Sequence, residues 1–289
     1  MLYEGVLLPA RTAVLPLDDR VATLGDAVFT TLGVRRGVAW RLGAHRQRLT
    51  RDVTAVLGLE VSAATALVAR AFDGSGLNEL LAANGLLQRD AALRICVSAG
   101  SAPRGLARPE TLQPRWWATA APATLGPRLV PGVRVATVAA PWLDGLAEAG
   151  LTQAKHASRL PWVLASQQRT AAGSEVDEVL LCNAAGEVVC ASVHNVFALD
   201  GDGHTLRTPS VAAGALPGIA RAAVLEQATR EGLTVVEAPI PLGTLREAPA
   251  VWLTNSLDRM AVVRTLDGST LPQRGGALVQ RLAAALDDE

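Results

Sequence analysis

Short apolar runs with strand character alternate along the chain with segments of helical periodicity. In the first half, strands are expected at residues 6–8, 25–32, 38–42, 92–98 and 115–121. Residues 44–57 predict a helix, and its apolar face consists of Leu49, Val53, Val56 and Leu57. Arg48 falls on a more polar face of that helix, and two further helices are expected at residues 62–71 and 77–83. This half therefore predicts a mixed unit of helices and strands.

The second half repeats the alternation after a stretch that is rich in proline. Residues 102–114 and 122–131 each carry three prolines, which is typical of a linker between domains. Beyond them, strands are expected at residues 133–139, 179–181, 188–189, 196–199, 235–238, 251–254 and 260–264, and helices at 160–164, 216–231 and 275–286. We therefore expect a mixed α/β (α+β) fold with an N-terminal domain over residues 1–121 and a C-terminal domain over residues 122–289.

Composition narrows the class of protein. Apolar residues make up 49% of the 289 residues and the formal net charge is zero, so a sizeable core is expected and nucleic acid is a poor partner. No apolar run is long enough to cross a membrane, and the N-terminus lacks the basic start of a signal peptide. The three widely spaced cysteines suggest a reducing cytoplasm, and the four histidines show no metal-ligand spacing. We expect a cytoplasmic protein with no metal, membrane or nucleic-acid partner.

Lys155 is the only lysine in the sequence, although the chain has 27 basic residues. Codon bias in a GC-rich genome explains why lysine is rare, but not why one lysine is kept at this position. An arginine can replace a lysine where only charge is needed, whereas a Schiff base requires an amine that can lose its proton. Lys155 is therefore a candidate catalytic amine, and the alternative is a leftover surface lysine.

Several short motifs occur in the order and spacing of one known family. They are Asp19-Arg20, Gly25-Asp26-x-x-Phe29, His45-x-x-Arg48-Leu49, Lys155, Asn195-Val196-Phe197, Thr208-Pro209, Leu216-Pro217-Gly218-Ile219-x-Arg221 and Thr254-Asn255-Ser256. Together they resemble the class IV aminotransferases, which are fold-type IV pyridoxal-phosphate (PLP) enzymes. The resemblance implies a small N-terminal α/β domain, a larger C-terminal pseudo-barrel domain and a homodimer. Within the family, Phe29-Thr30-Thr31 and Lys155-His156-x-x-Arg159-Leu160 resemble aminodeoxychorismate lyase more than the transaminases.

The resemblance also implies roles for single residues. Lys155 would attach PLP, and the cofactor phosphate would be bound by Arg48, by the helix start at Gly218, Ile219 and Ala220, and by Ser256. A helix start offers unpaired N–H groups to an anion, and arginine offers a fork of donors. The substrate would contact Thr30, Thr31, Arg159 and Asn255. Without the resemblance, Arg48 could equally be a solvated helix residue, Gly218 a plain turn residue and Ser256 a loop hydroxyl.

Cys190 is the main departure from the family pattern. Members of the family typically have a glutamate five residues before the position of Asn195, where it pairs with the pyridine nitrogen of PLP. A thiol is a much weaker partner for that nitrogen. Three explanations are open: PLP works with less electron withdrawal, Glu187 or water compensates, or the cofactor has been lost. Cys190 could also be simply a small buried apolar residue.

The resemblance and Cys190 together favour one reaction. We expect a PLP-dependent 4-amino-4-deoxychorismate lyase, which forms 4-aminobenzoate and pyruvate for folate synthesis from a small-molecule dicarboxylate. Aromatisation of the product drives that elimination, so it depends less on the cofactor ring as an electron sink than transamination does. The alternatives are a D-amino-acid or branched-chain amino-acid transaminase, and a PLP-free paralogue that only binds ligands.

Overall fold

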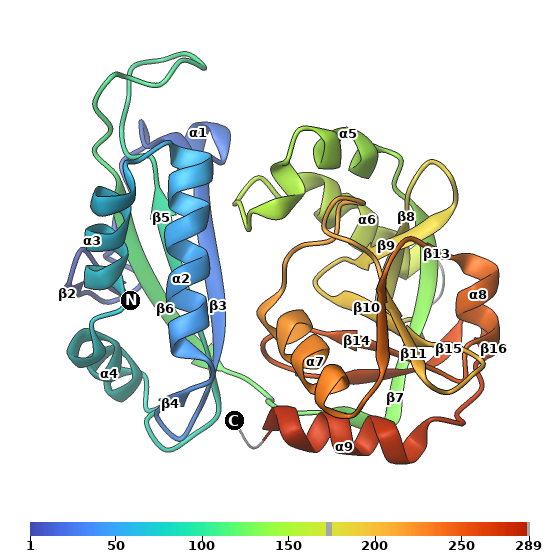
Figure 1. Cartoon of the computed structure of the whole chain (residues 1–289). Coiled ribbons are helices and arrows are strands. Elements are labelled where there is room, and N and C mark those ends of the chain that lie inside the picture. The colour runs from blue at the N-terminus through green and yellow to red at the C-terminus, as the bar shows by residue number, and fades with distance from the viewer. Residues whose placement is uncertain (172–174, 288–289) are drawn as a thin grey trace. The chain divides into compact units, whose positions relative to one another are not determined.

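The computed structural model describes residues 1–171 and 175–287 of the chain, which form two compact units (Figure 1). Unit 1 consists of Met1–Leu125 and Ala154–Ser158, and unit 2 consists of Gly126–Gln153 and the chain from Arg159 onward. The boundary expected between residues 121 and 122 lies at the end of a strand, and unit 1 continues to Leu125. The segment that carries Lys155 belongs to unit 1, although it follows the linker in the sequence.

Unit 1 is an antiparallel sheet with helices along one face (Figure 1). Its strand order is β2-β1-β6-β5-β3-β4. The strands are β1 (Leu2–Tyr3), β2 (Val6–Leu7), β3 (Ala27–Arg35), β4 (Val38–Ala39), β5 (Ala91–Ser98) and β6 (Arg115–Pro122). The helices are α1 (Arg20–Leu24), α2 (Leu42–Asp52), the π-helical turn η1 (Val53–Leu57), α3 (Val61–Ala71) and α4 (Gly74–Ala83).

The alternation of side chains along β3 divides unit 1 into two faces. Val28 and Leu32 are fully buried in the core that the sheet forms with the helices. Thr30 points to the same side, because strand residues two apart share a face. Phe29 and Thr31 therefore lie on the other face of the sheet. The core fixes the register of β3 and so decides which of its residues face α2.

Unit 2 is built on a ten-stranded sheet within the described part of the chain. The strand order is β12-β11-β10-β14-β15-β7-β8-β9-β13, and β16 pairs with β15. The strands are β7 (Arg128–Ala139), β8 (Glu178–Cys182), β9 (Glu187–Ala191), β10 (Asn195–Leu199), β11 (Thr205–Thr208), β12 (Thr234–Glu237), β13 (Ile240–Pro241), β14 (Ala250–Thr254), β15 (Ala261–Leu266) and β16 (Ser269–Thr270). The helices are α5 (Trp142–Glu148), the 3₁₀ turn η2 (Leu151–Gln153), α6 (Leu160–Ala171), α7 (Ile219–Arg230), α8 (Leu242–Glu247) and α9 (Gly276–Asp287).

The sheet of unit 2 is curled (Figure 1). It carries an apolar core on each side of its central strands. One core contains Leu180 and Val196, and the other contains Leu181, Cys190 and Trp162. The mixed α/β fold class expected from the sequence is confirmed. None of the helices in residues 1–171 and 175–287 is long and apolar enough to cross a membrane.

Candidate active site

The segment that carries Lys155 pairs with the first residues of β3. The N–H of Phe29 donates to the carbonyl of Lys155 at 2.9 Å, and the N–H of Ala157 donates to the carbonyl of Ala27 at 2.7 Å. Gly25 allows this approach, since a Cβ at that position would lie 2.5 Å from the Oγ of Ser158. Two backbone hydrogen bonds thus hold the main chain around the only lysine against the sheet of unit 1.

The side chain of Lys155 lies beside Phe29. Its Nζ is 4.9 Å from the centre of the Phe29 ring, and the guanidinium carbon of Arg94 is 3.7 Å from the same ring centre. An aromatic face attracts cations at such distances. Arg94 comes from β5 and is exposed, so two basic side chains, those of Lys155 and Arg94, lie within 5 Å of one aromatic ring. The sequence analysis did not single out Arg94, whose place beside Lys155 depends on the pairing of β5 with β3.

Arg48 is buried, with 6% of its surface exposed, and so is not a solvated helix residue. Its Nη2 donates to the Oγ of Thr30 at 2.6 Å, and that oxygen also lies 2.7 Å from the Nδ1 of His45. The Nε of Arg48 is buried and has no hydrogen-bond partner among the residues that the structure describes. Burial lowers the pKa of Arg48 to about 10, although Asp52 opposes the shift, and the group still carries its charge at neutral pH. A buried cation with an unused donor is the feature expected of an anion site.

The two threonines predicted to contact substrate lie in different environments. Thr30 is fully buried between His45 and Arg48, on the face of the sheet that α2 covers. Thr31 is partly exposed and lies on the face that carries Phe29 and Arg94, directly across from Arg94. Thr31 is therefore the threonine whose hydroxyl shares a face with the amine of Lys155.

Asp52 is a further residue at this site that the sequence analysis missed. Its side chain is 1% exposed, and its Oδ2 accepts the backbone N–H of Lys155 at 3.1 Å. The two residues are 103 positions apart in the sequence, so no local pattern could pair them. Only their spatial contact gives Asp52 a connection with the candidate amine.

In unit 2, the start of α7 forms a close contact with Asn195. The Nδ2 of Asn195 donates to the carbonyl of Leu216 at 2.8 Å, which fixes the turn before the helix. A Cβ on Gly218 would lie 2.2 Å from the Oδ1 of Asn195. The backbone of Gly218 is extended, a conformation that any residue can adopt. Glycine is therefore required here because the side chain of Asn195 comes so close, and not because of the dihedral angles. The N-cap residue Gly218 makes no side-chain cap, and the first N–H groups of the 12-residue helix, at Ile219 and Ala220, are of the kind that suits an anion.

A buried charge network supports the loop that contains Asn255 and Ser256. The Nδ1 of His194 lies 2.8 Å from the Oε2 of Glu178, and its Nε2 lies 2.9 Å from the Oδ2 of Asp258. Burial alone lowers the pKa of His194, but the hydrogen bonds to Asp258 and Glu178 raise it overall. The Oδ1 of Asn255 accepts the backbone N–H groups of Leu257 and Asp258 at 2.8 Å. His194 thus joins the loop after β14 to β8.

Cys190 is buried directly opposite Leu181 on the neighbouring strand β8. Burial raises the pKa of its thiol to about 12, an effect that Arg159 opposes and Glu178 reinforces. The thiol is therefore neutral at physiological pH. The Nη2 of Arg159 donates to the carbonyl of Ser192 at 3.2 Å, and its guanidinium lies 3.7 Å from the ring centre of Trp162. Cys190 thus combines an apolar packing role with a nearby arginine cation.

Glu187, considered as a substitute for the missing carboxylate, is engaged elsewhere. Its Oε2 accepts a hydrogen bond from the Nδ2 of Asn183 at 3.1 Å, and its backbone N–H donates to the Oδ1 of Asn183 at 2.8 Å. These contacts place it in the turn between β8 and β9. The carboxylate whose charge acts on Cys190 is instead Glu178, because it contributes to the raised pKa of the thiol.

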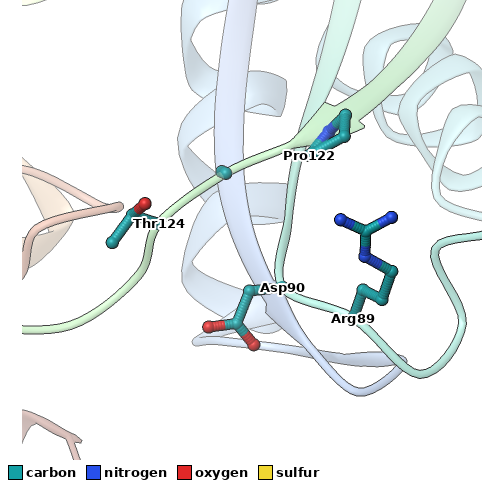
Figure 2. A pocket seen from close by; sticks show the side chains of 5 residues that line it. Arg89, Asp90, Pro122 and Thr124 are labelled. Atoms are coloured by element: carbon teal, nitrogen blue, oxygen red, sulfur yellow. The ribbon is translucent and has the colours of Figure 1, made fainter.

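A separate hollow in unit 1 has none of the predicted site residues in its walls. It has a volume of about 520 Å³ and is lined by Arg89, Asp90, Pro122, Ala123 and Thr124 (Figure 2). Figure 2 shows the charged groups of Arg89 and Asp90 pointing away from each other. With opposite charges aimed apart and no histidine, cysteine or lysine in its walls, this hollow does not resemble a catalytic centre.

Comparison with known proteins identifies the family. The model of the family described as amino-transferase class IV matches residues 27–266, which include every predicted site residue. The chain belongs to the class IV aminotransferases. The resemblance drawn from the sequence motifs is therefore confirmed, and PLP is the cofactor of the family.

Individual relatives differ in the activity that their names state. The bifunctional aminodeoxychorismate lyase / D-amino acid transaminase of Mycobacterium tuberculosis is 27% identical, with 93% of this chain and 92% of that protein covered. The D-alanine aminotransferase of Bacillus licheniformis is 25% identical, with 100% of this chain and 96% of that protein covered. The structure of 4-amino-4-deoxychorismate lyase from Pseudomonas aeruginosa is 27% identical with a TM-score of 0.76, and 96% of each chain is covered. The family is thus established, and the reaction must be argued from the site.

The residues of this class IV aminotransferase fit the cofactor of the family. Arg48 has an unused buried donor. The start of α7 follows Gly218, and any larger residue at that position would displace Asn195. Both features suit a phosphate dianion. At the position where the family's glutamate is expected, the chain offers a neutral thiol. Arg48 in unit 1 and the start of α7 in unit 2 each suit a phosphate by themselves, Lys155 suits the aldehyde, and the ring-nitrogen position is unusual.

Proposed function

We propose that the protein is a PLP-dependent 4-amino-4-deoxychorismate lyase, which forms 4-aminobenzoate and pyruvate. The observation that carries the proposal is the environment of Cys190. A neutral thiol that feels the positive charge of Arg159 does not help a basic nitrogen to take up a proton. Transamination needs a strongly electron-withdrawing ring. The ring must take up the negative charge that forms on the substrate while a proton moves from one carbon to another. The elimination expels an aromatic product and tolerates a weaker ring.

When bound, PLP supplies an aldehyde for the substrate amine and a conjugated ring that withdraws electrons. Arg48 and the N–H groups at the start of α7 would hold its phosphate, and Ser256 would add a hydroxyl. Lys155 is the only lysine that can attach the aldehyde. Its backbone is fixed against β3, so its amine returns to the same place when the attachment is released.

The same residues can then perform the proton transfer and bind the substrate. Once its amine is free, Lys155 acts as the general base for the proton on the substrate α-carbon. The substrate carries two carboxylates, and Arg94 lies beside the same ring as the Lys155 amine. We therefore add Arg94 to Arg159 as a candidate carboxylate ligand. Thr31 and Asn255 would contribute hydrogen bonds to the substrate.

A coupled assay tests the proposal. Chorismate, glutamine and an aminodeoxychorismate synthase are mixed with this protein, with and without PLP, and 4-aminobenzoate is followed by its fluorescence. Product that requires both the protein and PLP is the expected result. Product from rigorously stripped protein without PLP, or no product in either mixture, contradicts the proposal.

A transaminase is the second candidate, because three matched relatives, among them a branched-chain-amino-acid aminotransferase of Methanocaldococcus jannaschii, bear aminotransferase or transaminase in their names. Incubation with D-alanine or branched-chain amino acids and 2-oxoglutarate would then produce glutamate. Glutamate formation without 4-aminobenzoate formation would favour this candidate. A third possibility, a PLP-free binding module, predicts protein that stays colourless after PLP is added, whereas the unused donor of Arg48 leads us to expect a coloured complex.

A further inference from the structure

Asp52 is a buried carboxylate whose position no local role explains. It is the last residue of α2, and the chain changes to the π-helical turn η1 directly after it. Arg48 and Asp52 are four residues apart and therefore lie on the same face of α2. Burial of a carboxylate is costly unless its oxygens have partners. A π-helical turn is found frequently at functional sites, which makes the partners of Asp52 informative.

The two oxygens of Asp52 have different partners. Oδ1 accepts hydrogen bonds from the Nη2 of Arg51 at 3.0 Å and from its Nε at 3.3 Å. Oδ2 accepts the backbone N–H of Lys155 at 3.1 Å. The carbonyl of Lys155 is held separately by the N–H of Phe29. The N–H and the carbonyl of Lys155 are thus both fixed, and this sets the direction in which its side chain leaves the backbone.

We propose that Asp52 is the positioning residue of Lys155, and that it acts through the acceptor oxygen Oδ2 and not through its charge. The proposal rests on the proposed function of Lys155 as the residue that attaches PLP. A lysine side chain is long and flexible, so the place of its amine depends on how firmly its base is held. The charge of Asp52 faces arginines instead: Arg51 bonds to the other oxygen, and Asp52 raises the pKa of Arg48 against the effect of burial.

Two substitutions separate the acceptor from the charge. Asp52→Asn keeps an oxygen for the Lys155 N–H, and Arg51 is half exposed and can turn its guanidinium to solvent. Asp52→Ala removes both the oxygen and the charge. Asp73→Ala is the matched control, because the Oδ2 of Asp73 also accepts a backbone N–H in unit 1, that of Gly76 at 3.0 Å. Thermal unfolding of each apoprotein establishes that the variants are folded.

Amide hydrogen exchange at Lys155 in the apoprotein measures the contact directly. Asp52→Ala is expected to speed exchange at this amide at least tenfold, whereas Asp52→Asn and Asp73→Ala leave it within about threefold of the parent protein. Because the chain has only one lysine, reductive methylation gives a second apoprotein measurement. The rate at Lys155, relative to the N-terminal amine, is expected to change in Asp52→Ala alone. Unchanged exchange and methylation in Asp52→Ala would overturn the proposal.

Attachment of PLP to Lys155, trapped with borohydride and quantified by mass spectrometry, connects the contact to function. Asp52→Asn should attach PLP at nearly the parent rate, and Asp52→Ala at least tenfold more slowly. If Asp52→Ala does not fold, a tenfold loss in Asp52→Asn overturns the proposal. A parent protein that never attaches PLP refutes the proposed function, while the exchange and methylation results still decide whether Asp52 holds Lys155.

Discussion

Replacement of Arg48 by methionine should separate cofactor binding from stability. The guanidinium of Arg48 is buried, and its Nη2 donates to Thr30. The Oγ of Thr30 keeps its contact with His45 in the variant, and Asp52 keeps its contacts with Arg51 and Lys155. Neither the Thr30 hydroxyl nor the Asp52 carboxylate is therefore left without a partner. The substitution also removes the cost of burying a cation, so the free energy of unfolding of the apoprotein should fall by less than about 1 kcal/mol or should rise.

The affinity of the Arg48→Met variant for PLP should, in contrast, fall strongly. Arg48 offers its unused Nε to the phosphate, and a charge-assisted hydrogen bond contributes about 1.5–3 kcal/mol. Loss of this bond corresponds to a dissociation constant that is roughly 10- to 150-fold higher. An absorbance titration with PLP measures the change. Pyridoxal, which lacks the phosphate, serves as the control ligand, and its affinity should be nearly the same in the parent and the variant.

The exposed Arg46 on the same helix provides the control variant, and Arg46→Met should bind PLP like the parent protein. Three results would refute the reasoning about Arg48. The first is an Arg48→Met variant that binds PLP as tightly as the parent. The second is an equal loss of affinity for PLP and pyridoxal. The third is a destabilisation of several kcal/mol, which would make Arg48 a structural residue.

Three further predictions concern other parts of the site. Lys155→Ala should abolish borohydride-trapped PLP and reduce turnover to background in the coupled assay; normal turnover would disprove the mechanism. Cys190→Glu should leave lyase turnover within about tenfold of the parent, and a gain of several orders of magnitude would show that the carboxylate is needed after all. The raised pKa of His194 means that its stabilisation is complete below pH 6.5 and is lost as the pH rises through its folded-state pKa. The lowered pKa of Glu178 means that its contribution is complete above pH 4.5 and is lost as the pH falls. His194→Gln should therefore flatten the decline of Tm on the alkaline side, and an unchanged Tm profile would exclude this role for His194.

The apolar pattern predicted the order of helices and strands well, because the elements have clear periodicity. The helix expected at residues 44–57 exists, but its last turn is π-helical from Val53 onward. Five residues are too few for apolar positions to distinguish a π turn from an α turn. The short helices α1, α5 and α8 were not predicted. They have five, seven and six residues, or no more than two turns each, which is too little for a periodic signal.

The site shows a sharper limit of sequence reasoning. Rarity and the family motifs both drew attention to Lys155, and the motifs drew attention to Arg48. The burial of Arg48 could not be read from its helix, because the partner that accepts its hydrogen bond comes from β3. Arg94 and Asp52 have no distinctive local sequence. The first reaches the site through strand register and the second through a contact with a segment 103 residues away.

The two explanations of Cys190, as a packing residue and as a functional departure, are compatible in this structure. The thiol packs in an apolar cluster with Leu181 and Trp162, which explains why it is neutral. A neutral group next to Arg159 is also what a weakly protonated ring nitrogen would require. Arg48, with its unused buried donor, and Lys155, with its fixed backbone, both match the family pattern. The chain thus keeps residues suited to bind a phosphate and attach an aldehyde, and it changes the residue expected at the ring nitrogen from glutamate to Cys190. This combination fits an elimination that is driven by aromatisation of its product.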